Sequence, residues 1–269
     1  MRRAGSTWYA AARILLLLLI SPTLGHAQDL DGSTKWQVLR HVLFGDREVK
    51  SSASDVLELF VRKRAEDAAV VPVMIRARID QTPERYIRHI YLIIDENPSP
   101  FGVKFTLTPE SGRADIETRV RLESSSPVRA IAELNDGSLW MQSAMVYGAG
   151  GCSAPIGSLR EEETIGRMRL RVDSDIAVPG KPVLAQLSIQ HPQYSGMEAN
   201  SQIAPRFVRQ VNVYYADRLV MSADVDFTIS EDPSFRFYFL PTADGKLRAE
   251  VVDSTELRYE NAVTVQKPR

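Results

Sequence analysis

The sequence contains a single cysteine, Cys152, in 269 residues. A lone cysteine cannot form an internal disulfide, so its thiol is a reactive group, an intermolecular partner or a buried bystander. Glycines at 148, 150 and 151 precede it, and Ser153-Ala154-Pro155 follows. Glycine has no Cβ to restrict the backbone, and proline cannot continue a sheet ladder. The stretch therefore predicts an exposed thiol on a flexible arm rather than in a packed core.

An excess of positive charge is also absent, because the sequence contains 33 basic and 34 acidic side chains. The chain thus has no basic footprint for nucleic acid. Its four histidines include no pair at a metal-ligand spacing. The sequence has no G-x-S-x-G elbow, no phosphate loop and no dinucleotide fingerprint. The sequence therefore contains few residue patterns typical of an enzyme, and we expect no metal or cofactor.

Long apolar runs are missing too, and the most apolar stretch, residues 14–20, is shorter than the ~20 residues that span a bilayer. Arg2, Arg3 and Arg13 precede this stretch, and Gly25-His26-Ala27 follows it. This pattern predicts a secretory signal peptide over residues 1–27, with export and no membrane insertion. A retained membrane anchor is the alternative interpretation.

What the sequence does contain is alternation of apolar and polar residues. Residues 36–44 have helical spacing and end at Gly45, which predicts a short helix after the signal peptide. Period-two patterns then predict strands at 71–79, 86–94, 116–122, 128–134, 168–172, 183–189, 208–215, 219–227, 235–239, 247–252 and 257–265. Asn135-Asp136-Gly137 predicts a hairpin turn, and Asp244-Gly245 predicts a second one leading into 247–252.

This pattern predicts an all-β protein of two β-sandwiches in tandem. The stretch 153–166 contains Pro155, Gly157 and three consecutive glutamates but few apolar residues, so we interpret it as a linker. The expected organisation is a signal peptide at 1–27, a first domain at 28–152, the linker at 153–166 and a second domain at 167–269.

Several stretches carry a family resemblance. Residues 86–98, 118–121, 128–132, 136–137 and the terminal Gly150-Gly151-Cys152 resemble SoxY of sulfur oxidation. Residues 191–196, 205–208 and 231–237 resemble its partner SoxZ. The order of the two halves and their fusion resemble SoxYZ-like carriers found with quinoprotein (PQQ) alcohol dehydrogenases. The resemblance covers nearly all of the chain after the signal peptide.

The resemblance implies two immunoglobulin-like sandwiches and a carrier without catalytic activity. Cys152 would covalently hold a sulfur-containing intermediate, and Gly148, Gly150, Gly151 and Ser153 would form the arm. The implied partners are periplasmic sulfur-oxidation enzymes or cytochromes, or a quinoprotein dehydrogenase. In SoxY the cysteine motif ends the chain, whereas here Ser153-Ala154-Pro155 follows and a second domain continues. The arm is therefore tied at both ends and must enter a partner as a loop.

Two alternatives stay open at this point. The chain could be a non-catalytic docking module for a quinoprotein dehydrogenase or its cytochrome, with Cys152 incidental. A thiol enzyme would need a base beside Cys152, for which His191 is the candidate. His191 and Tyr194 are also candidates for tuning the thiol, although a structural histidine at the end of a strand is the simpler interpretation. The segment 95–100 is either a plain turn or a loop beside the arm or between the domains.

Overall fold

The computed structural model describes residues 30–51, 53–155, 159–173, 178, 180–199 and 202–266. The predicted signal peptide, residues 1–27, lies outside this part. Within it, the chain forms two β-sheets, one α-helix and two short 3-10 helices, η1 (Pro109–Ser111) and η2 (Glu162–Thr164). The predicted all-β class is confirmed.

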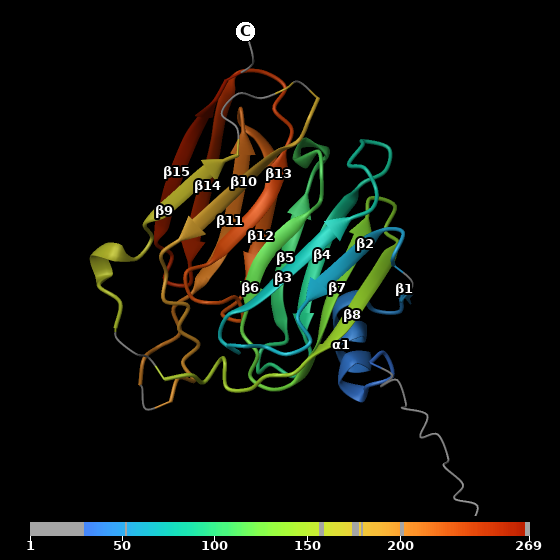
Figure 1. Cartoon of the computed structure of the whole chain (residues 1–269), viewed down its shortest axis with the longest axis vertical. Coiled ribbons are helices and arrows are strands. Elements are labelled where there is room, and N and C mark those ends of the chain that lie inside the picture. The colour runs from blue at the N-terminus through green and yellow to red at the C-terminus, as the bar shows by residue number, and fades with distance from the viewer. Residues whose placement is uncertain are drawn as a thin grey trace, which may run out of the picture.

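The described strands form a nine-stranded and a six-stranded sheet, stacked as two layers (Figure 1). The order in the nine-stranded sheet is β1 (Val49–Lys50), β8 (Leu139–Val146), β7 (Ser126–Leu134), β4 (Ile87–Ile94), β5 (Phe101–Leu107), β12 (Arg218–Val225), β11 (Val208–Tyr215), β14 (Gly245–Asp253) and β15 (Arg258–Val265). The order in the six-stranded sheet is β2 (Leu57–Val61), β3 (Val71–Ala77), β6 (Ile116–Val120), β13 (Ser234–Phe239), β10 (Val183–Ile189) and β9 (Met168–Val172).

Each sheet is shared between the two halves of the chain, so the two sandwiches join edge to edge. In the nine-stranded sheet, β5 pairs antiparallel with β12 over five residue pairs, from Val103↔Val225 to Leu107↔Met221. In the six-stranded sheet, β6 meets β13 at the single pair Glu117↔Arg236. Pairing covers two edge strands that would otherwise expose unpaired backbone groups. We call the line along β5–β12 and β6–β13 the seam; in Figure 1 it separates the blue-to-green half from the yellow-to-red half.

One hydrophobic core runs across the seam. The inward-facing residues of both halves belong to a single cluster of buried side chains. Phe105 of β5 packs edge-to-face on Phe235 of β13, with ring centroids 5.9 Å apart. The two sandwiches therefore share one interior.

One of the two predicted hairpins is wrong. Gly137 has a positive φ of 85° and turns β7 into its antiparallel neighbour β8, as predicted. Asp244-Gly245, in contrast, connects β13 of the six-stranded sheet to β14 of the nine-stranded sheet. Turn residues indicate that the chain changes direction. They do not specify whether the next strand pairs with the preceding one or crosses to the other sheet.

The helix α1 (Thr34–Phe44) covers the outer face of the nine-stranded sheet, near β4, β7 and β8. The Ser33 hydroxyl caps its first turn by accepting a hydrogen bond from the Trp36 amide (3.1 Å). Gly45, with φ of 62°, ends it. Trp36 and Phe44 pack on outward-facing apolar side chains of the sheet, among them Ile93 and Ile131.

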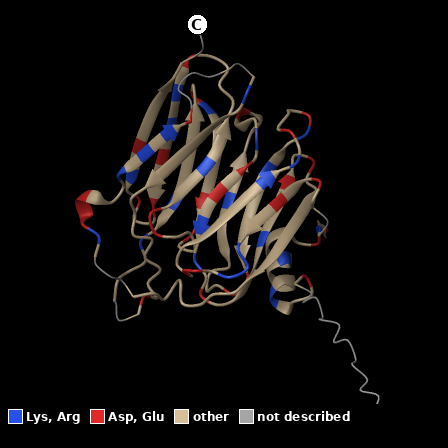
Figure 2. Ribbon diagram, in the orientation of Figure 1, with Lys and Arg blue, Asp and Glu red and all other residues tan. Residues whose placement is uncertain are grey.

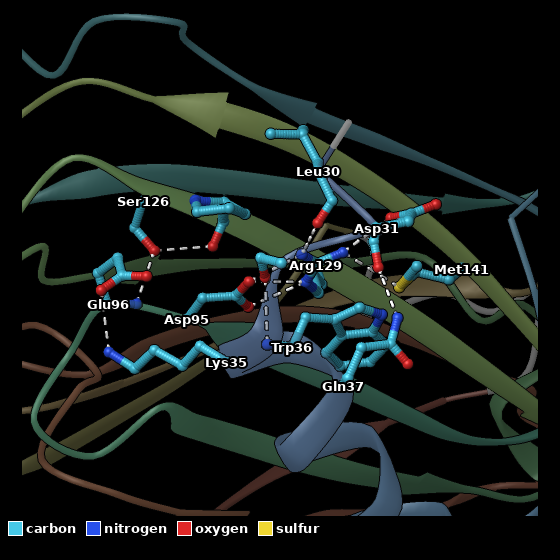
Figure 3. Close-up of polar contacts among 12 residues, drawn as sticks. Leu30, Asp31, Lys35, Trp36, Gln37, Asp95, Glu96, Ser126, Arg129 and Met141 are labelled. Carbon is cyan, nitrogen blue, oxygen red and sulfur yellow. Dashed lines mark hydrogen bonds and ion pairs between the residues drawn. The ribbon is translucent and has the colours of Figure 1, made fainter. Parts of the chain in front are cut away.

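Arg129 on β7 fixes the beginning of the described chain to this face (Figure 3). Its guanidinium donates to both carboxylate oxygens of Asp95 (2.8–3.0 Å), to the Asp31 carboxylate (2.9 Å) and to the Leu30 carbonyl. It also lies over the Trp36 ring, 4.3 Å from the ring centroid. The side chains of Arg129 and Asp95 are fully buried, so each depends on the other for compensation of its charge.

We therefore expect Arg129→Met to lower the free energy of unfolding by about 3–5 kcal/mol, because it leaves the Asp95 carboxylate buried without its partner. Urea unfolding followed by circular dichroism measures the change. The double variant Arg129→Met/Asp95→Asn should recover part of the loss. Arg209→Met, which breaks the exposed pair with Glu256, is the matched control and should cost about 0–1 kcal/mol. Equal losses in the two single variants would contradict the assignment.

Candidate functional site

The predicted arm, residues 148–153, leaves β8 and lies against the sandwich as an ordered segment. The Gly150 amide donates to the Glu123 carbonyl (2.8 Å), and the Gly151 amide donates to the Leu122 carbonyl (2.7 Å). Gly150 has a φ of 78°, a conformation that glycine adopts at little cost. In this structure the arm is therefore docked, and the predicted loose, exposed backbone is not observed.

Gly151 is needed for a close approach. A Cβ at this position would lie 2.1 Å from the Ala68 carbonyl oxygen and 2.7 Å from that of Leu122. At Gly148 a Cβ would lie 3.1 Å from the Ala65 side chain. These glycines allow the arm to pack closely against residues 65–68. Close packing in the docked state is therefore sufficient to account for glycine at these two positions.

The Glu123 carboxylate holds the end of the arm. One of its oxygens accepts hydrogen bonds from the amides of Cys152 and Ser153, each 3.0 Å long. The other accepts a 2.7 Å hydrogen bond from the Ser153 hydroxyl. Hydrogen bonds to an ionised acceptor are stronger than those between neutral groups. Glu123 is therefore the main side-chain contact that fixes Cys152 in place.

The second half of the chain holds the other side of the arm. The Ser195 hydroxyl lies 3.1 Å from the Cys152 carbonyl oxygen, and the Ala199 amide donates to the Ser153 carbonyl (3.1 Å). Arg121, at the end of β6, donates to the Gln193 carbonyl (2.7 Å). Cys152 thus lies at the seam between the two halves.

The Cys152 side chain is buried, with 1% of its surface exposed, and it forms no disulfide. Burial, together with the negative charge of Glu123, raises the pKa of the thiol to about 12, although Arg121 opposes the shift. Asp226 and Glu198 add to the negative potential. The prediction of an exposed thiol is wrong for this conformation, because Gly151 permits close packing as readily as it permits mobility.

The two predicted thiol-tuning residues occupy other surroundings. His191 is buried, and its Nε2 lies 3.5 Å from the Asp253 carboxylate, while its Nδ1 accepts a 3.4 Å hydrogen bond from the Gln193 amide. Burial lowers the pKa of His191. The Tyr194 hydroxyl accepts from the Arg160 amide (3.3 Å). Neither side chain is among the groups whose charge acts most strongly on the thiol, and their tuning role stays a prediction.

Two residues near the arm were not singled out as site residues from the sequence: Glu123, which binds it directly, and Arg121, whose charge acts on the Cys152 thiol. The segment 95–100 supports both of them. The Asn97 side chain donates to the Arg121 carbonyl (2.8 Å) and accepts from the Glu123 amide (2.9 Å). Ser99 donates to Asp226 across the seam (3.2 Å). This segment is thus a loop beside the arm that also joins the halves, as the second interpretation of it proposed.

The described residues contain no group of three or more His, Cys, Asp or Glu side chains arranged to hold a metal ion. No helix among them is long and apolar enough to cross a bilayer.

Comparisons with known proteins place both halves of the chain in families. Residues 40–152 match the family model of sulfur oxidation protein SoxY, and residues 170–264 match that of sulphur oxidation protein SoxZ. The SoxY match ends at Cys152. A search of curated proteins finds no match.

Among solved structures, the chain is similar to the sulfur carrier protein SoxY from Chlorobium limicola f thiosulfatophilum. The two are 19% identical with a TM-score of 0.36, over 42% of this chain and 91% of that one. It is also similar to superoxide reductase (neelaredoxin) from Ignicoccus hospitalis. Here the identity is 16% and the TM-score 0.32, over 37% of this chain and 94% of that one.

The raised pKa predicts that native Cys152 reacts slowly with iodoacetamide. A shift from 9.0 to about 12 lowers the thiolate fraction near neutral pH by roughly 1000-fold. The stability that the protonated thiol contributes is present below pH 9.0 and is lost as the pH rises to about 12. Mass spectrometry of alkylation against pH, with the urea-unfolded chain as control, measures the effect. Equal rates in the native and unfolded chains would refute the docked arrangement.

The hydrogen bonds to Glu123 predict that Glu123→Ala speeds alkylation of Cys152 by about 10- to 100-fold, because the arm loses its charged acceptor and opens more often. Glu123→Gln keeps one acceptor oxygen and should give a smaller increase. Glu256→Ala, which removes an exposed glutamate paired with Arg209, is the control and should leave the rate unchanged. If Glu123→Ala reacts no faster than this control, Glu123 does not hold the arm.

Proposed function

Because this chain joins a SoxY domain and a SoxZ domain, families of sulfur-oxidation carrier and adaptor proteins rather than catalysts, we propose that it is a periplasmic carrier. Cys152 holds a sulfur-containing intermediate covalently and presents it to partner sulfur-oxidation enzymes. The observation that carries the proposal is the position of the chain's single cysteine. It ends the SoxY match and lies on a glycine arm at the seam.

The chemistry explains why a carrier needs partners. When a thiolate joins the outer sulfur of a thiosulfate-type anion, an S–S bond forms and two electrons must leave. A partner redox protein, such as a cytochrome, therefore takes the electrons, and the thiol proton passes to solvent. Attack of a partner's thiolate on the outer sulfur later breaks this S–S bond, so that Cys152 leaves as the thiolate and the sulfur-containing group passes to the partner.

The docked arm fits a carrier that exposes its cargo site only when a partner binds. The thiolate is the form of cysteine that attacks, and burial suppresses it here. A partner that holds the arm away from Glu123 would return Cys152 to water and restore an ordinary thiol pKa. The reactive group is thus protected from stray oxidation between encounters.

The test is mass spectrometry of protein purified from the native periplasm under non-reducing conditions. We expect mass additions that match sulfur-containing groups, that localise to the peptide with Cys152, and that reducing agent removes. Cys152→Ser should lack them and should stop sulfur oxidation in a strain that depends on this chain. A bare thiol under all growth conditions, with a Cys152→Ser strain that oxidises sulfur normally, would refute the proposal.

A second candidate function rests on the burial of Cys152. A thiol that is 1% exposed with a raised pKa also suits a structural residue in a docking module. That module would bind a quinoprotein dehydrogenase or its cytochrome without carrying cargo. Pull-down of the dehydrogenase with wild type and Cys152→Ala separates the two. Equal recovery of the enzyme with equal alcohol-oxidation activity favours docking alone.

A further inference from the structure

The outer face of the six-stranded sheet has a groove of about 1210 Å³ that crosses all six strands. The interior face of this sheet packs into the core, whereas the groove lies on the opposite face. Its charge is markedly uneven, because six arginines and only two acidic residues line it. The chain as a whole is almost neutral, with a formal net charge of −1. Figure 2 colours Lys and Arg blue and Asp and Glu red, and it shows blue bands, with red ones among them, on the strands of the two sheets.

Strand register places the groove residues in rows that cross the sheet. One row, formed by directly paired residues, is Phe60, Met74, Glu117, Arg236, Gln186 and Arg171. In the next row, Arg119 pairs with Pro72, and Ser188 pairs with both Ser234 and Arg169. The arginines therefore occupy neighbouring strands on both sides of the seam and face the same way.

The two acidic side chains of the groove are already engaged. Glu117 pairs with Arg236 (3.0 Å), and Asp232 pairs with Arg160 (3.0 Å). Arg169 and Arg171 are exposed on β9 and have no hydrogen bond or ion pair with another described side chain. The groove thus has guanidinium groups available for an anionic partner.

Other groove residues suit contact with a protein. Phe60 is 44% exposed, and the Arg76 guanidinium lies over its ring at 5.5 Å. Met74 and Met168 also line the groove. Aromatic, methionine and arginine side chains are enriched at protein interfaces. Arg119 is held in place by its 2.7 Å hydrogen bond to the Asp232 carbonyl, which lowers the entropy lost on binding.

From this arrangement we propose that the groove binds an acidic segment of a partner protein in an extended conformation. Six strands spaced about 4.8 Å apart span about 24 Å, which matches about seven extended residues. The volume of about 1210 Å³ exceeds the usual range of about 300–1,000 Å³ for small-molecule pockets. Arginine clusters bind acidic segments through paired hydrogen bonds from guanidinium to carboxylate.

The groove reaches the vicinity of the docked arm. Arg119 lines it, and Arg121, two residues further along, is one of the charges that act on the Cys152 thiol. A segment bound in the groove would therefore bring its protein to the end of the sandwich where the arm lies. Binding in the groove does not itself require the thiol.

The test uses a fluorescein-labelled peptide of eight glutamates and fluorescence anisotropy at low ionic strength. We expect the double variant Arg169→Glu/Arg171→Glu to weaken binding at least tenfold, and Arg169→Gln/Arg171→Gln to weaken it less. The control is Arg88→Glu/Arg258→Glu, two exposed arginines on the nine-stranded sheet, which should change affinity by less than twofold. Circular dichroism melting checks that each variant is folded.

The outcomes separate this proposal from the carrier function. Cys152→Ser should bind the peptide as tightly as the wild-type protein does. Failure of the carrier proposal would therefore leave the peptide-binding result unchanged. Equal weakening by the two arginine-to-glutamate pairs would show a non-specific charge effect and overturn the proposal. Succinate, added at the same carboxylate concentration as the peptide, is the competitor. If it displaces the peptide, the groove binds small anions, and the proposal of a polypeptide ligand is overturned.

Discussion

The pairing of β5 with β12 is the constraint on which the rest of the structure depends. It converts the exposed edges of two sandwiches into the middle of one nine-stranded sheet. The seam then aligns β6 with β13, so that one core and one outer groove cross both halves. It also fixes Ser195 and Ala199 beside the arm that emerges from the first half. A fused chain keeps this geometry at any protein concentration, whereas two separate subunits would depend on mass action.

The docked arm sets an energetic condition on any transfer reaction. Its hydrogen bonds with Leu122, Ser195 and Ala199 each contribute about 0.5–1.5 kcal/mol, and those to the Glu123 carboxylate about 1.5–3 kcal/mol. A difference of a few kcal/mol leaves an open form at about 0.1–10% of the population. A partner that binds only the open form has its apparent affinity reduced by that fraction. A second contact distant from the thiol, such as the basic groove, would offset this reduction through effective concentration.

Much of the fold could be predicted from the sequence because period-two alternation is a local signal. Strands such as β3, β6 and β10 follow it closely. The role of Asp244-Gly245 could not be predicted, since pairing partners lie far apart in the chain. Burial of Cys152 was missed for a related reason: the groups that hold the arm, Glu123 and Ser195, lie 29 and 43 residues away. Glycine next to a cysteine indicates backbone freedom, and only the tertiary contacts decide whether that freedom serves motion or close packing.

The continuation of the chain beyond Cys152 changes how cargo could be delivered. Ser153 is tied to the second half through the Ala199 amide, and Glu123 holds it from the first half. The arm must therefore be released from both halves before Cys152 can move outward. A loop carries two chain segments into a cleft, and adjacent backbone segments require about 5 Å of separation. Under the proposed carrier function, a partner's site that receives Cys152 would have to be wider than one that accepts a single free chain end.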